Sequence, residues 1–164
     1  MTVILGIHAT KIRGKFSHPN GPSVTQGHAW ITVTKNNFTQ SYSVWPDYEP
    51  KVNDNGWKGS DLRKEIEVDP RYSNSFRIRQ SRYFQLNMMQ QNKLNVILQK
   101  YVFHRPTHNC ASWVAEVARK VTSENVRADE KFHRYIESPR QMGAYIQKME
   151  TKTPSSLKNP ILPS

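Results

Sequence analysis

Hydrophobic residues recur along this chain with two different periods. A period of two marks the stretch from Gly27 to Thr34, where apolar and polar residues alternate, and the stretch from Phe38 to Trp45 continues the pattern. Asn36 and Asn37 lie between the two, and asparagine readily adopts positive φ in tight turns. The pattern therefore predicts a β-hairpin. Further strands are predicted over Thr2–Ile7 and over Ser75–Leu86, the latter with one solvated basic face that includes Arg79.

A two-residue loop at Asn36-Asn37 decides which side chains of this hairpin share a face. It pairs Val33 with Gln40, and the alternation then gives one apolar and one polar face. The apolar face holds Ala29, Ile31, Val33, Phe38, Tyr42 and Val44. The polar face holds His28, Trp30, Thr32, Ser41, Ser43 and Trp45. A three-residue loop shifts the pairing by one and moves Gln40 and Tyr42 to the face of His28, and the sequence leaves both registers open.

A period of 3.6 residues marks the helices. After Asn109, a good N-cap residue, one apolar stripe runs from Cys110 to Val121 and predicts a helix with Cys110 in its first turn. A second helix, over Asn87–Tyr101, directs its inner side to the core. That inner side consists of Leu94, Ile97, Leu98 and Tyr101. Shorter helical segments are predicted over Asp61–Glu65, Asp129–Ile136 and Ser138–Met149, the last with Ser138 as N-cap.

Segments rich in Gly, Pro, Asn and Asp separate these elements. Loops are predicted over Lys11–Gly21 and Asp47–Pro70, and Trp57 in the second loop either lines a substrate cleft or anchors the loop to the core. The 164 residues are enough for one domain. We therefore predict a single α+β domain over residues 1–150, with an antiparallel sheet packed against helices. A disordered or draped tail is expected over residues 151–164.

Composition and charge narrow the possible partners. The formal charge of +11 favours anionic partners such as bacterial wall polymer, acidic lipid surfaces or acidic proteins. The basic residues are scattered and accompany no nucleic-acid-binding motif, so no nucleic-acid partner is expected. No stretch approaches 18 apolar residues and the start lacks a basic lead, so neither a transmembrane helix nor a cleaved signal is expected. The chain would begin as a cytoplasmic product or leave its cell without a cleaved signal.

Cys110 is the only cysteine and the first candidate for chemistry. The free amides and the dipole of a helix start favour a thiolate and should lower the thiol pKa. A nearby base would then make Cys110 a nucleophile, and the alternative is a small buried core residue. A metal site is a further option. Its ligands would be His28, His104, His108 and Cys110.

Three stretches together resemble a known family. Gly27-His28-Ala29-Trp30-Ile31, Tyr42-Ser43-Val44-Trp45-Pro46 and the run from Asn109 to Val117 are similar to the circularly permuted branch of the NlpC-type papain-like hydrolases. That branch includes lecithin–retinol acyltransferase-like enzymes and secreted bacterial toxins, and type VI secretion effectors are a looser match. The resemblance implies a papain-like sheet packed on helices, with the catalytic cysteine at a helix N-terminus.

The resemblance also assigns roles to individual residues. It implies Cys110 as nucleophile and His28 as general base and acid, with no metal or cofactor. The family places a third polar residue on the strand after that of the histidine. Counting from His28 as in the acyltransferase-like members favours Gln40 for this role, whereas strand phase favours Ser41 or Ser43. The Cys110 amide and the Asn109 side chain could stabilise the oxyanion. The candidates for the substrate cleft are Trp30, Trp45 and Trp57.

The expected activity is amide hydrolysis in peptidoglycan peptides by an antibacterial effector. The thiolate would attack a carbonyl carbon, form a thioester, and release it to water activated by His28. The resemblance would place the protein in the periplasm of a target cell, with a cognate immunity protein as partner. The alternatives are a lipid acyl-ester or thioester hydrolase or acyltransferase of the same branch, and a non-enzymatic basic binding module.

Overall fold

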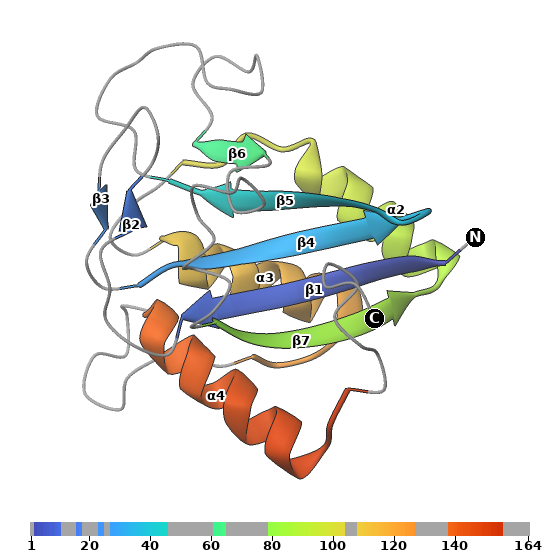
Figure 1. Ribbon diagram of the computed structural model, residues 1–164. Coiled ribbons are helices and arrows are strands. Elements are labelled where there is room, and N and C mark those ends of the chain that lie inside the picture. Colours follow the sequence, from blue (N-terminus) through green and yellow to red (C-terminus); the bar gives the residue numbers. More distant parts are fainter. Residues whose placement is uncertain are drawn as a thin grey trace.

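The computed structural model describes residues 2–10, 16–17, 23–24, 27–45, 61–64, 79–103, 108–126 and 138–155. An antiparallel sheet in the order β6-β5-β4-β1-β7 forms its centre, and three helices of the described chain pack against it (Figure 1). The strands of this sheet are β1 (Val3–Thr10), β4 (Ala29–Lys35), β5 (Phe38–Val44), β6 (Leu62–Lys64) and β7 (Arg79–Leu86). The helices are α2 (Met88–Leu98), α3 (Cys110–Thr122) and α4 (Pro139–Lys152). This arrangement confirms the α+β class.

The hairpin of β4 and β5 adopts the two-residue register. Ile31 pairs with Tyr42 and Val33 with Gln40. Asn36 and Asn37 have φ values of 51° and 63°, as a type I′ turn requires at its two central positions. The predicted separation of apolar and polar faces therefore holds along these strands, and the three-residue alternative is wrong.

The central strand, β1, is longer than the sequence pattern predicts. It pairs with β4 on one side and β7 on the other and continues past Ile7 to Thr10. Leu5 and Ile7 are completely buried on the side of the helices, whereas His8 and Thr10 are completely buried on the opposite side. The prediction ended at Ile7 because polar residues interrupt the apolar pattern there, yet these polar residues are also interior.

The helix that starts at Cys110 is confirmed, and α3 is the main support of the apolar face. Its stripe of Cys110, Trp113, Val114, Val117, Ala118 and Val121 is buried throughout. In the same cluster lie Leu5 and Ile7 of β1 and Met142 and Ile146 of α4. The hydrophobic core therefore occupies one side of the sheet, between the strands and the three helices.

Helix α2 is shorter than predicted at both ends. Asn87 is its N-cap and forms a capping box with Gln90, so the first helical residue is Met88. The helix ends at Leu98, and the amide of Lys100 bonds to the carbonyl of Ile97 in a closing turn. Tyr101 therefore lies beyond the helix and is 63% exposed, so its predicted inward orientation is wrong.

The helical turn predicted over Asp61–Glu65 is wrong, because residues 62–64 form the edge strand β6. Ser43 pairs with Arg63 and Val44 with Leu62. The backbone of Asp61 accepts from the amide of Trp45 at 3.0 Å and donates to the carbonyl of Val102 at 2.7 Å. Tertiary pairing with β5 thus overrides a weak local helical pattern, as is common for segments of a few residues.

The basic face predicted for β7 is not fully solvated at Arg79, and Arg82 lies on the opposite face of the strand. Arg79 is half-buried and donates from Nε to Ser81 Oγ at 3.0 Å. Arg82 points to the helix side, where Nη1 lies 2.6 Å from Glu150 Oε1 and 2.8 Å from the Thr153 carbonyl. Nε of Arg82 is 3.4 Å from Glu124 Oε1. This cluster ties the edge of the sheet to α4 and to the segment after α3.

The remaining predictions concern short or terminal segments. Ser138 caps α4 as predicted, and this helix continues through Lys152, so residues 151 and 152 belong to a helix rather than to a tail. The predicted loop over Lys11–Gly21 contains β2 (Phe16–Ser17), which pairs with β3 (Ser23–Val24) just beyond it. The predicted helix over Asp129–Ile136 and the tail beyond residue 155 lie outside the described residues.

Candidate active site

Cys110 is the first residue of α3. Asn109 caps this helix, because its Oδ1 accepts from the amides of Ala111 and Ser112 at 2.9 and 3.2 Å. Within the described residues, the amide of Cys110 has no hydrogen-bond partner, and an oxyanion donor from the Asn109 side chain would have to be its nitrogen, because an amide oxygen only accepts. Cys110 itself is 8% exposed within the apolar cluster.

His28 lies directly before β4, after Gly27 with its φ of 93°. Its backbone is fixed to the end of β1, because its amide donates to Thr10 Oγ1 at 2.9 Å and its carbonyl accepts from the Thr10 amide at 3.0 Å. The imidazole lies 4.2 Å from the indole of Trp45 and 5.8 Å from that of Trp30, measured between ring centres. With 2% exposure, His28 is held between two indoles.

The structure separates the three candidates for the orienting residue. Ser43 lies on the face of His28, and its hydroxyl accepts from Trp45 Nε1 at 2.7 Å. Ser43 therefore positions the indole that stacks on the imidazole. Ser41 is buried on the same face, opposite Thr32. Gln40 lies on the other face and accepts from the Tyr42 hydroxyl at 2.6 Å. The strand pairing thus brings Ser43, and not Gln40, to the surroundings of His28.

The sulfur and the imidazole are not joined by a hydrogen bond. In the described part of the chain, Cys110 makes neither a hydrogen bond nor an ion pair. Its side chain belongs to the cluster under the apolar face, whereas the ring of His28 packs with Trp30 and Trp45 on the polar face. The first turn of α3 nevertheless lies toward the end of the sheet at which β4 begins (Figure 1). A productive pair therefore requires the His28 side chain to leave its place beside the indoles of Trp30 and Trp45.

The sequence analysis missed the buried cluster around His8. Nδ1 of His8 is 2.8 Å from Ser81 Oγ, and Nε2 is 2.8 Å from Thr32 Oγ1. The ring also stacks on Trp30 at 5.3 Å. Burial, with a smaller effect of the Arg79 charge, holds the pKa of His8 well below its usual value, so the imidazole is neutral. Strand alternation continued past Ile7 would have placed His8 on the face of His28.

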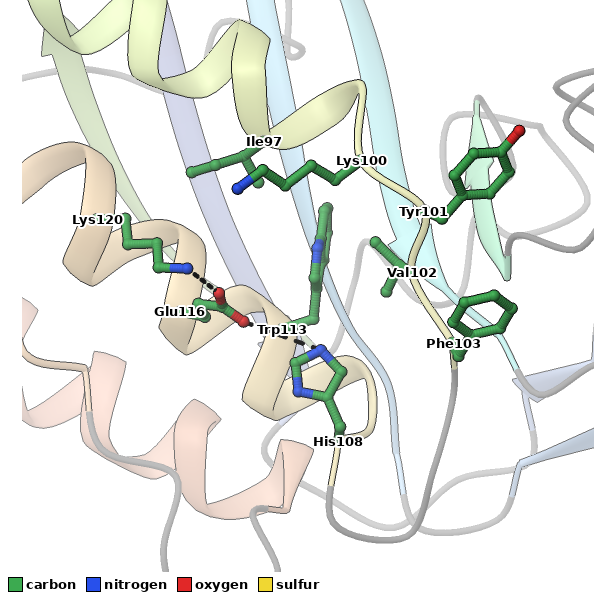
Figure 2. Close-up of a pocket in the computed structure, with 9 residues that line it drawn as sticks. All are labelled: Ile97, Lys100, Tyr101, Val102, Phe103, His108, Trp113, Glu116 and Lys120. Carbon is green, nitrogen blue, oxygen red and sulfur yellow. Dashed lines mark hydrogen bonds and ion pairs between the residues drawn. The ribbon is translucent and has the colours of Figure 1, made fainter.

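A pocket of about 280 Å³ lies beside the start of α3 (Figure 2). Glu116 lies between two basic side chains there. It forms an ion pair with Lys120 one turn later and lies 3.9 Å from His108 Nε2. Trp113 forms part of the pocket wall on the side of α3. The segment from Lys100 to Phe103 faces α3 across the pocket. His108 thus has a carboxylate partner, but it does not belong to the buried face of His28.

Two predicted site residues cannot be placed. Trp57 and His104 lie outside the described residues. Within the described ranges, no three His, Cys, Asp or Glu side chains come together in a way that could hold a metal ion. The metal-site alternative therefore finds no support in the part of the chain that the structure describes.

Comparison with known proteins does not assign the chain to a family. The chain matches no protein-family model, no curated protein and no solved structure. Among its described helices, none is both long and apolar enough to cross a bilayer.

Proposed function

We propose that the protein is a cysteine hydrolase of the papain-like type, with Cys110 as nucleophile and His28 as general base and acid. The observation that carries the proposal is the placement of the only thiol at the first residue of a capped helix, toward the sheet end at which β4 begins directly after His28. A helix start supplies a backbone amide for the developing oxyanion, and a base that takes the thiol proton supplies the nucleophile. These are the two groups that acyl transfer to sulfur requires.

The proposed general base, His28, packs against an aromatic neighbour. Trp45 covers the imidazole and is itself held by Ser43. In the proposed step, the imidazole takes the thiol proton, the thiolate attacks the carbonyl carbon, and the leaving group receives the proton as the thioester forms. Water activated by His28 then releases the acid and regenerates the thiol.

The proposed substrate is an amide bond in a peptidoglycan peptide, because the charge of +11 suits an anionic wall polymer. The protein would then act as an antibacterial effector. A lipid acyl ester is the second substrate class. The observation that favours it is the apolar hollow between α2 and Lys120, where Met89, Val96 and Ile97 could receive an acyl chain. Either substrate would be attacked by the same sulfur.

Mass spectrometry of the protein with purified peptidoglycan and, separately, with phospholipid vesicles tests both substrates. New peptide termini indicate an amidase, and new fatty acids indicate a lipid hydrolase. Cys110→Ala should abolish either product. His28→Gln should slow product formation by roughly 10²–10⁴-fold, the usual contribution of a general base.

His108→Gln is the matched control, because His108 also lies near the start of α3 but not on the face of His28. It should leave turnover within about two-fold, the change expected when no catalytic group is lost. The proposal fails if Cys110→Ala retains turnover, or if His108→Gln reduces it as much as His28→Gln does. Absence of both products, together with a wild-type thiol that iodoacetamide alkylates no faster than a free cysteine, supports the binding module instead.

A further inference from the structure

Helix α2 carries apolar side chains on its outer surface as well as on its inner one. Leu94 is 1% exposed in the core, whereas Met88, Met89 and Val96 are 78%, 69% and 55% exposed. A helix at the surface of a globular protein usually shows polar residues there. The exposed apolar face of α2 is therefore a candidate binding surface.

The charged groups that α2 and the turn after it carry beside this apolar surface are all positive. Lys93 follows Met89 at helical spacing, and Lys100 lies in the turn after α2; both lysines are exposed. From Met88 to Lys100 there is no acidic residue. Lys120 of α3 also borders this surface, but it is paired with Glu116 (Figure 2). Lys93 and Lys100 thus carry the net charge.

We propose that this face of α2 docks on the surface of a bilayer that contains anionic phospholipids. Apolar side chains beside lysines fit the boundary between acyl chains and head groups, because the lysine stems lie along apolar surface while the ammonium groups reach the phosphates. Between α2 and Lys120 the surface is hollowed to about 500 Å³ and lined almost entirely by apolar atoms. The overall charge of +11 strengthens the same attraction. This docking does not depend on the proposed hydrolase activity.

Sedimentation with vesicles tests the proposal. The wild-type protein should bind vesicles of phosphatidylglycerol mixed with phosphatidylcholine, and it should bind pure phosphatidylcholine much more weakly. Lys93→Glu with Lys100→Glu should weaken binding to the anionic vesicles by at least about twenty-fold, since each lysine near such a surface contributes about five-fold. The matched control is Lys148→Glu with Lys152→Glu on α4, which changes the total charge equally at exposed positions.

A second measurement reports insertion itself. In a Cys110→Ala background, Met89→Cys and Lys148→Cys each provide one thiol for an environment-sensitive fluorophore. The label at position 89 should shift to the blue on anionic vesicles, and the label at position 148 should not. The proposal is overturned if the wild-type protein does not bind anionic vesicles, or if both charge-reversed variants lose binding equally. It is also overturned if neither label shifts to the blue or if both do. Self-association that Met88→Gln with Met89→Gln abolishes would assign the surface to a second copy of the chain instead.

Discussion

The two faces of the sheet are both buried, but different interactions hold them. On the helix side, Leu5 and Ile7 of β1 pack against α3 and α4 without polar partners. On the opposite side, His8 is equally inaccessible but bonds to Ser81 and Thr32 and stacks on Trp30. Neighbouring residues of β1 are therefore stabilised in different ways, by apolar packing on one face and by hydrogen bonds on the other.

The difference determines what each face can do. An apolar face tolerates changes of shape if volume is kept, whereas a buried polar face fails once a single partner is lost. Reactive groups need oriented partners, so the polar face is the one that presents imidazoles in fixed environments. His28, Trp45 and Ser43 are on that face. Cys110 approaches from the apolar side, and the proposed site depends on the strand end where the two faces meet.

The largest stability effect that we predict comes from Gly6→Ala, on the polar face of β1. An added Cβ would lie 2.4 Å from Thr32 Oγ1 and 2.6 Å from His8 Nε2, closer than any carbon can approach them. The His8–Thr32 hydrogen bond must therefore break or the strand must shift. We expect a loss of roughly 3 kcal/mol in the free energy of unfolding, the sum of overpacking and an unsatisfied buried group.

Chemical denaturation measures this loss, and the double variant Gly6→Ala with Thr32→Ala supplies its control. Removing the threonine oxygen makes room for the new methyl group, so the double variant should be more stable than the sum of the two single effects predicts. Strict additivity would contradict the proposed close contact.

Much of the apolar face could be predicted from the sequence, because its signals are local. The stripe of α3, the cap at Asn109 and the turn at Asn36-Asn37 each lie within a few residues, and the structure confirms them. The predicted helical turn at residues 61–65 failed because β6 exists only through its pairing with β5. No local pattern encodes such pairing across a long connection.

The polar face was predicted less completely. The hairpin alternation placed His28, Trp30 and Ser43 together, as found. The role of His8 could not be predicted, because its partners Ser81 and Thr32 lie 73 and 24 residues away. A histidine in a strand carries no sequence signal that separates a buried, hydrogen-bonded ring from an exposed one.

A smaller effect concerns the dependence of stability on pH. The neutral ring of His8 has a pKa far below its usual value because of burial, whereas in the unfolded chain it protonates near pH 6.5. Below that pH the unfolded state binds a proton that the folded state excludes. Stability should therefore fall as the pH decreases below about 6.5, by up to roughly 1.4 kcal/mol per pH unit.

Urea unfolding between neutral and mildly acidic pH checks this slope. His8→Gln keeps a polar group toward Thr32 but does not titrate, so its free energy of unfolding should depend less on pH than that of the wild type. At neutral pH this free energy should be lower than that of the wild type, because glutamine does not reproduce both hydrogen bonds of the ring. Ile7→Val, from the apolar face of the same strand, should cost about 1 kcal/mol at every pH. If His8→Gln keeps the full slope of the wild type, another group is responsible.

The smallest predicted effect concerns the turn that assigns every hairpin residue to its face. Asn37 adopts a φ of 63°, a left-handed conformation that glycine adopts with less strain. Asn37→Gly should therefore stabilise the protein by about 0.5 kcal/mol, and Asn37→Val should destabilise it by more than that, because a β-branched residue resists positive φ. Thermal unfolding measures both. Because the turn fixes the register but touches neither face, the pH dependence attributed to His8 should be the same in both variants. A changed pH dependence in either would show that the register had shifted and that side chains had exchanged faces.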